Sequence, residues 1–210
     1  MCGGAAIPYT QNGLALGFGS AWVVCTPQRR VERVTGGKVV ATVALPEEPW
    51  AIAAGEGAVW ALARDGSTVY RISPAGNRLA GHVDLGANGV YLWTLGGAVW
   101  VADDADSSLL RVDPAGLRVT ARLAVGDGPS GLAFDGAYLW LVSHRENSLD
   151  RIDPSTNAVT RIAECFMVEE ATSSIPAPLV ASIGVPASFE ETTQARTSPV
   201  SVTQPVTIAA

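Results

Sequence analysis

The stretch GEGAVWALARDGSTVYRISPAGN at residues 55–77 decides the fold, because the chain repeats it. The same pattern returns as LGGAVWVADDADSSLLRVDPAGL at residues 95–117 and as DGAYLWLVSHRENSLDRIDPSTN at residues 135–157. A less regular copy, GFGSAWVVCTPQRRVERV, occupies residues 17–34. One supersecondary unit of about 40 residues therefore occurs four times in the sequence, which is typical of repeat architectures.

The second copy shows what the unit is. Short apolar or alternating runs predict four strands, and glycine, proline and polar turn residues separate them. The expected strands are residues 50–54, 58–63, 68–72 and 78–85. Ser73-Pro74-Ala75-Gly76 suits a type I turn, and no long stretch has a helical period. Four short antiparallel strands in a repeat of about 40 residues indicate one blade of a β-propeller.

The sequence thus predicts an all-β propeller of about four four-stranded blades over residues 8–162. After residue 162 the pattern fails, and residues 163–210 form a tail rich in Ser, Thr, Pro and Ala that is expected to be disordered. The expected blades are residues 12–45, 49–85, 89–125 and 129–162.

Four blades are the lower limit for a closed propeller. The chain either closes as four blades or is part of a larger, incomplete propeller, and we favour the second because no terminal blade is shared between the two ends of the repeats. In an incomplete propeller the outer faces of the first and last blades are apolar. Self-association through these faces is then expected.

Each copy carries a tryptophan that is followed eleven residues later by an arginine. A large ring at one place in every sheet is best explained by packing between neighbouring blades. An aromatic platform for sugars or bases is the alternative. The arginines are expected to play a structural role across a blade edge. The pairs are Trp22 and Arg33, Trp60 and Arg71, Trp100 and Arg111, and Trp140 and Arg151.

Composition narrows the function classes. The net charge of −6 and the single lysine, Lys38, argue against a nucleic-acid partner. No run approaches the roughly 18 apolar residues of a membrane span, and the first residues lack the basic start of a signal peptide. We therefore expect a soluble protein, although the compartment is not indicated. The three cysteines, Cys2, Cys25 and Cys165, predict neither a disulfide framework nor a zinc site.

The loops after the tryptophan strands are equivalent in every blade, so they should gather on one propeller face. His144 and Glu146 are the candidate catalytic residues there, with His144 as general base. Carboxylates at Asp103, Asp104 and Asp106 could hold Mg²⁺ or Ca²⁺.

Candidate ligand-binding residues on the same face are Trp50, Arg64, Asp65 and Arg145. Trp50 stands at a strand entry, where the fourth copy has Ser130, and is therefore a better surface candidate than the recurring tryptophans. The alternative for all these loops is that they are solvated hairpin turns, in which Asp and Asn are favoured for backbone reasons.

The motifs G-x-G-A-V-W-V-A, R-I-D-P and G-x-x-P-x-G-L-A resemble YVTN and NHL-type β-propellers, and most of all the streptogramin (virginiamycin B) lyase-like group. The resemblance implies a metal-assisted elimination that opens a cyclic depsipeptide, with His and Glu side chains on one face. In that group the repeats read W-F-T-E. The positions of this sequence that match the glutamate of W-F-T-E are Cys25, Ala63, Asp103 and Ser143, so one of the four carries a carboxylate.

The sequence therefore favours a non-catalytic propeller that binds a protein or small-molecule ligand on its loop face, without a cofactor, as the sensor part of a bacterial surface or signalling protein. A lyase that uses His144 with a metal near Asp103 is the first alternative. A propeller fragment without a separate activity is the second.

Overall fold

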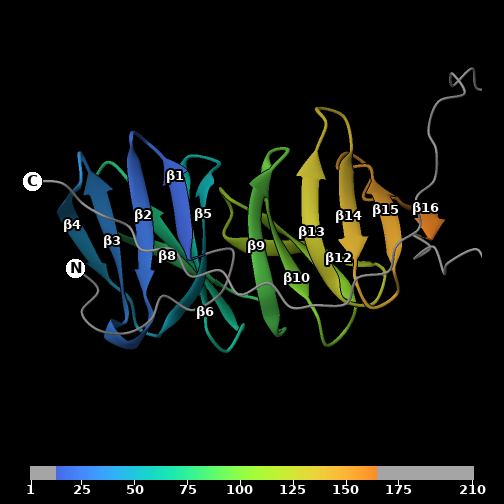
Figure 1. Cartoon of the computed structure of the whole chain (residues 1–210), viewed down its shortest axis with the longest axis horizontal. Helices are drawn as coiled ribbons and strands as arrows, with labels where there is room; N and C mark the ends of the chain where they lie inside the picture. The colour runs from blue at the N-terminus through green and yellow to red at the C-terminus, as the bar shows by residue number, and fades with distance from the viewer. Residues whose placement is uncertain (1–12, 165–210) are drawn as a thin grey trace, which may run out of the picture. The chain divides into compact units, whose positions relative to one another are not determined.

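The computed structural model describes residues 13–164, which form sixteen β-strands in four sheets (Figure 1). The first sheet holds β1 (Leu14–Gly17), β2 (Ser20–Cys25), β3 (Arg30–Thr35) and β4 (Lys38–Ala44). The second holds β5 (Pro49–Gly55), β6 (Ala58–Ala63), β7 (Thr68–Ser73) and β8 (Arg78–Asp84). The third holds β9 (Gly89–Leu95), β10 (Ala98–Asp103), β11 (Ser108–Asp113) and β12 (Arg118–Ala124). The fourth holds β13 (Pro129–Phe134), β14 (Leu139–Ser143), β15 (Ser148–Ile152) and β16 (Val159–Glu164).

Each sheet is an antiparallel meander in which strands that follow one another in the chain also lie side by side. This confirms the prediction of four four-stranded propeller blades. Within residues 13–164 the only helix is one 3-10 turn, η1 (Thr26–Gln28), so no helix there has the length and apolar character needed to cross a membrane. The tail that is expected to be disordered, residues 163–210, lies outside the described residues except for 163 and 164 at the end of β16.

The hydrophobic core consists of three clusters, one between each pair of successive sheets. Strands β6 and β10 are buried along their whole length, because each belongs to a sheet that is covered on both faces. Among the described residues, no cluster joins the first sheet to the fourth. The two terminal sheets therefore each keep one face that no other described sheet covers.

The recurring tryptophans pack between blades, as predicted, in three of the four copies. Trp22, Trp60 and Trp100 are fully buried, and each ring lies in the cluster shared with the following sheet. Each indole Nε1 also donates a hydrogen bond to the backbone carbonyl five residues earlier. Trp140 is only half-buried, because no described sheet follows the fourth one. Its Nε1 donates to the Asp135 carboxylate instead, at 2.8 Å.

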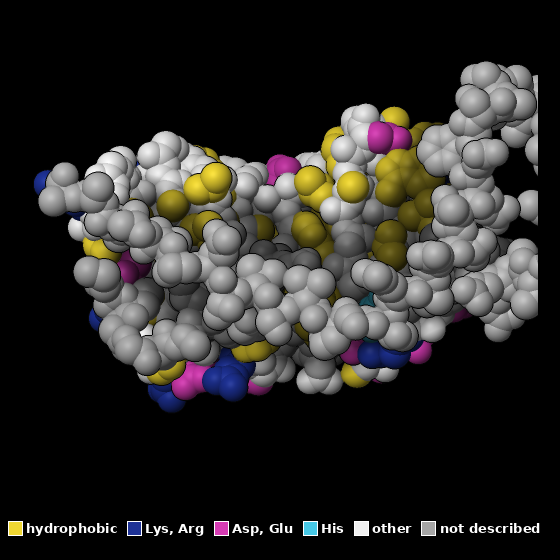
Figure 2. Space-filling model, in the orientation of Figure 1, with side chains coloured by type: hydrophobic (Ala, Val, Ile, Leu, Met, Phe, Trp, Pro, Cys, Tyr) yellow, Lys and Arg dark blue, Asp and Glu magenta, His cyan; other side chains and the backbone are white. Residues whose placement is uncertain are grey.

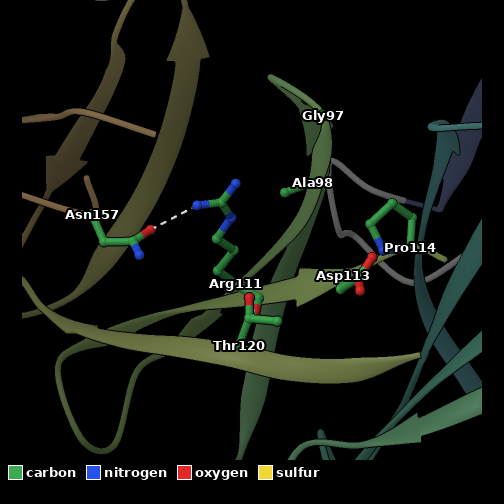
Figure 3. A pocket seen from close by; sticks show the side chains of 7 residues that line it. All are labelled: Gly97, Ala98, Arg111, Asp113, Pro114, Thr120 and Asn157. Atoms are coloured by element: carbon green, nitrogen blue, oxygen red, sulfur yellow. Dashed lines mark hydrogen bonds between the residues drawn. The ribbon is translucent and has the colours of Figure 1, made fainter. Parts of the chain in front are cut away.

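The arginines connect successive blades. Arg111 pairs with Trp100 across the strands, and its guanidinium lies 5.6 Å from the indole centroid. Its Nη1 donates to the Pro154 carbonyl at 2.6 Å and to Asn157 Oδ1 at 2.9 Å, both in the β15–β16 turn of the next blade (Figure 3). A pocket of about 240 Å³ lies beside this contact. The structural role expected for these arginines across a blade edge is thus confirmed for Arg111.

Arg33 makes the same contact one pair of blades earlier. Its Nη1 donates to the Pro74 carbonyl at 2.8 Å and to Asn77 Oδ1 at 2.9 Å. We call this contact the arginine latch. It is incomplete between the second and third blades, because Leu117 stands where the other turns have asparagine. The buried Nε of Arg71 there has no hydrogen-bond partner within residues 13–164.

Leu117→Asn is expected to complete the latch and to raise the free energy of unfolding by less than about 1 kcal/mol, because the net value of a hydrogen bond is about 1 kcal/mol and the half-buried Leu117 gives up packing against the core cluster of the second and third sheets. Leu117 has a φ of 50°, a left-handed conformation that asparagine tolerates better than leucine. Urea unfolding measures the change. Asn77→Leu is the matched control and should lower stability by a similar amount, since it removes the Arg33 latch. An unchanged or lower midpoint for Leu117→Asn would contradict this account.

One cysteine differs from the prediction made for it. Cys25, at the end of β2, is buried and disulfide-bonded. The two other cysteines, Cys2 and Cys165, lie outside the described residues. The wide spacing of the cysteines in the sequence gave no sign of a disulfide at Cys25, because spacing does not say which sulfur atoms the fold brings together.

Candidate functional site

The loop face comprises the connections that follow the second strand of each sheet, together with the connections between sheets. Because every sheet is a four-stranded meander, these connections lie at the same end of the strands. Figure 2 shows basic and acidic side chains next to each other along the lower edge of the view. The structure thus brings the loops of the predicted site onto one face, as expected.

Asp103, a predicted metal ligand, is fully buried at the end of β10. Its Oδ1 accepts backbone hydrogen bonds from Ala105 and Asp106 at 3.2 and 3.4 Å. Its Oδ2 accepts from Arg122 Nη1 at 3.0 Å, and the same nitrogen lies 3.6 Å from Asp106 Oδ2. Asp103 therefore closes the β10–β11 turn and neutralises Arg122.

Arg145 clamps the third and fourth blades together. Its Nη2 lies 2.7 Å from Asp104 Oδ1, and its Nε donates to Asp127 Oδ1 at 3.1 Å. The hydrogen bonds to Asp104 and then to Asp127 raise the pKa of Arg145 above its usual range. In turn, the hydrogen bond from Arg145 lowers the pKa of Asp127. Arg145 therefore has two carboxylate partners, one in the β10–β11 turn and one in the connection between the third and fourth blades.

These ion pairs bear on the predicted cation site. Within residues 13–164, no group of three or more His, Cys, Asp or Glu side chains lies close enough together to hold a metal ion. All three predicted ligands face an arginine, Asp103 and Asp106 facing Arg122 and Asp104 facing Arg145, and these arginines repel a cation. The arrangement at Asp103, Asp104 and Asp106 does not fit Mg²⁺ or Ca²⁺, which need several free oxygen donors.

His144 and Glu146 belong to the same loop but have separate partners. The Nδ1 of His144 lies 2.7 Å from the Gly128 carbonyl, which can only accept, so Nδ1 is the donor and, in the neutral ring, Nε2 keeps the lone pair. Glu146 receives hydrogen bonds from Arg161 at 2.9 and 3.1 Å and from the Asp127 backbone. Arg161, and then that backbone N–H, lower the pKa of Glu146. Glu146 is therefore a poor proton donor or acceptor at neutral pH.

Sequence reasoning missed Asp150, a second buried carboxylate beside this loop. It accepts hydrogen bonds from Arg161 Nε and from the Gly126 backbone, at 2.5 and 3.0 Å. Arg161, held between Asp150 and Glu146, has a pKa raised above its usual range by both carboxylates. The sequence did contain a sign of this residue, because Asp150 is charged at a strand position where the second and third copies have Tyr70 and Leu110.

A pocket of about 460 Å³ opens on the loop face at the second blade, with Glu47, Glu48, Arg64 and Asp65 in its lining. Arg64 Nη1 lies 3.1 Å from Glu48 Oε2, and the Arg64 guanidinium lies 5.9 Å from the centroid of the Trp50 ring. The structure thus brings together three of the four predicted ligand-binding residues, Trp50, Arg64 and Asp65, while Arg145 lies in the clamp of the fourth blade.

Tyr70 supports one wall of this pocket. Its hydroxyl donates to Glu47 Oε2 at 3.0 Å. Burial and then the hydrogen bond to Glu47 raise the pKa of Tyr70 to about 12. Glu47 and Glu48 were missed as site residues, although two consecutive glutamates between Pro46 and Pro49 were a visible signal in a connection between blades.

No protein-family profile matches the chain, and no curated protein does. Solved structures match with probability 1.00. A catalytically inactive virginiamycin B lyase from Staphylococcus aureus, crystallised with quinupristin, is 19% identical with a TM-score of 0.61, over 73% of this chain and 57% of the lyase. A streptogramin B lyase is 17% identical with a TM-score of 0.62, over 78% of this chain and 58% of that one.

BamB from Moraxella catarrhalis is 14% identical with a TM-score of 0.56, over 70% of this chain and 47% of BamB. The chain therefore spans only about half the length of these proteins. Identities this low establish a shared fold and no shared activity. The sheets, their order and these matches together show that the chain is a β-propeller similar in fold to the streptogramin lyases.

Proposed function

We propose that this protein is a non-catalytic propeller module that binds a positively charged group of a protein or small molecule in the second-blade pocket. The observation that carries the proposal is the lining of that pocket, to which residues 13–164 contribute the carboxylates of Glu47, Glu48 and Asp65 against the guanidinium of Arg64. Its volume of about 460 Å³ lies in the range of small-molecule sites.

The pocket offers more than negative charge. Trp50 lies beside Arg64, so an incoming ammonium or guanidinium group can contact the indole face as Arg64 does. Arg64 is well exposed and has one carboxylate partner at 3.1 Å. A ligand cation can therefore displace it at small cost, because exposed ion pairs contribute only about 0–1 kcal/mol.

Lyase chemistry receives less support from the same face. Glu146 is held by Arg161, and Asp103 is buried against Arg122. One observation favours the enzyme: the Nε2 of His144 keeps a lone pair that could accept a proton, because Nδ1 is bonded to Gly128. A general base alone, without an available carboxylate or cation site beside it, does not complete a metal-assisted elimination.

Titration calorimetry with the capped peptides Gly-Arg-Gly, Gly-Lys-Gly and Gly-Glu-Gly tests the binding proposal. The arginine and lysine peptides are expected to bind and the glutamate peptide is not. Glu48→Gln should weaken binding by about 5- to 10-fold, which corresponds to roughly 1 kcal/mol for one partly exposed charge pair. Glu56→Gln is the matched control, since Glu56 lies in the β5–β6 turn at the opposite end of the strands.

Two results would contradict the proposal. One is equal binding of all three peptides, or equal affinity of the Glu48→Gln and Glu56→Gln variants. The other is turnover of quinupristin by the intact chain that is lost in His144→Ala, which would establish the lyase alternative.

A further inference from the structure

We propose that the exposed face of the fourth blade of one chain packs against the exposed face of the first blade of a second copy, so that two chains close into one ring. The observations are the exposure of two apolar sheet faces and the way in which the same positions pair inside the chain. The inference is independent of the ligand pocket.

The first of these faces lies on β14 and β15, where Figure 2 shows hydrophobic side chains at the surface. Val142 is 43% exposed, whereas its counterparts in the preceding blades, Val24 and Leu62, are 1% and 0% exposed. Leu149 and Trp140 are half-buried, although the residues at the same positions in the other blades are fully buried. We call Trp140, Val142 and Leu149 the leading face.

The second face lies on the first blade. Leu14 and Leu16 of β1 are 55% and 75% exposed, and Val39 of β4 is 42% exposed. The residues that match Leu14 in the next two blades, Ile52 and Leu92, are 3% and 2% exposed, because each packs on the preceding sheet. We call Leu14, Leu16 and Val39 the trailing face.

Inside the chain, leading positions always pack on trailing positions. Trp22 and Val24 lie in one cluster with Ile52, and Trp60 and Leu62 lie in one cluster with Leu92. The leading face of the fourth blade and the trailing face of the first are therefore the two halves of an interface that the chain already forms three times. Contact between these two faces would bury their apolar side chains as the same positions are buried inside the chain.

The arginine latch is not required for such a contact. The first blade has the short turn Gly36-Gly37 where the second and fourth blades have the latch turn, so this turn offers Arg151 no asparagine acceptor. The interface between the second and third blades also lacks the latch at Leu117, yet it forms one of the three core clusters. In this structure the Arg151 guanidinium lies 4.7 Å from the centroid of the Tyr138 ring.

The number of chains in the assembly follows from the requirement that the blades close into a ring. A leading-to-trailing contact joins two different faces, so it generates either a closed ring or an open filament. The four blades that the structure describes give eight in two chains, which lies within the usual range of roughly 4–8 for propellers, whereas three chains exceed it. We therefore expect a closed dimer of twice the chain mass of 21.7 kDa.

Light scattering coupled to size-exclusion chromatography tests the dimer on the full chain. The wild type is expected to be dimeric, and Val142→Lys and Leu16→Glu should each be monomeric. Ala75→Lys, in an exposed turn of the second blade, is the control and should remain dimeric. Val142 and Leu16 are both well exposed, so each variant is expected to fold. Circular dichroism checks this.

Mixing the Val142→Lys and Leu16→Glu variants provides the decisive measurement. In a head-to-tail ring their mixture has one unaltered interface, and both introduced charges fall in the other, so dimers should return. The proposal is overturned if the wild type is monomeric at about 100 μM, where a micromolar interface would be saturated. It is also overturned if Leu16→Glu alone stays dimeric, or if the mixture remains monomeric.

Discussion

Trp60→Ala is expected to lower the free energy of unfolding by about 3–5 kcal/mol, the usual cost of truncating a buried aromatic side chain. Trp60 is fully buried between the second and third blades. Its truncation also removes a hydrogen bond of 3.1 Å to the Gly55 carbonyl and the ring below the Arg71 guanidinium. Urea unfolding followed by circular dichroism measures the loss.

Trp140→Ala is the matched control for this experiment. The same residue type at the same repeat position should lose much less stability, because no described sheet covers it. Both variants are best measured in the Leu16→Glu background, so that self-association does not contribute. Equal losses at the two positions would mean that burial between blades does not determine the role of the tryptophan. Trp60→Phe replaces the alanine variant if the latter does not fold.

Asp103→Ala is expected to cost about 2–3 kcal/mol, the value of losing hydrogen bonds to a charged group. The side chain is fully buried, closes its turn through two backbone donors and pairs with Arg122 at 3.0 Å. Arg122 itself is 38% exposed, so water can hydrate it after the substitution and the larger penalty of a fully buried lone charge does not apply.

Asp104→Ala provides the comparison from the same loop. Its ion pair with Arg145 is half-exposed, so the loss should be about 0–1 kcal/mol. Thermal and urea unfolding measure both variants. A destabilisation by Asp104→Ala as large as that by Asp103→Ala would contradict the structural role assigned to Asp103. Stabilisation of the wild type by added Mg²⁺ or Ca²⁺, lost in Asp103→Ala, would instead establish the cation site that the acidic loop suggested.

Several features of the site were visible in the sequence because they depend on repeat position alone. The loop residues Arg64, Asp103 and His144 share one face because each follows or ends the second strand of its blade. The partners of these residues were not visible. Arg122 and Arg161 come from outer strands, and the β-bulges next to Arg111 and Leu149 shift the register that decides which carboxylate each arginine meets.

The sequence by itself determined the four-stranded blade, its repetition and the place of the tryptophan in it, because these follow from hydrophobic periodicity and turn chemistry within about 40 residues. Only the tertiary structure decided which residues are free to act. Burial between sheets depends on the neighbour that each sheet has, so Trp60 belongs to the core while Trp140 faces outward. Coulomb attraction across blades then pairs Asp104 with Arg145, while Glu47, Glu48 and Asp65 lie around an open pocket together with Arg64.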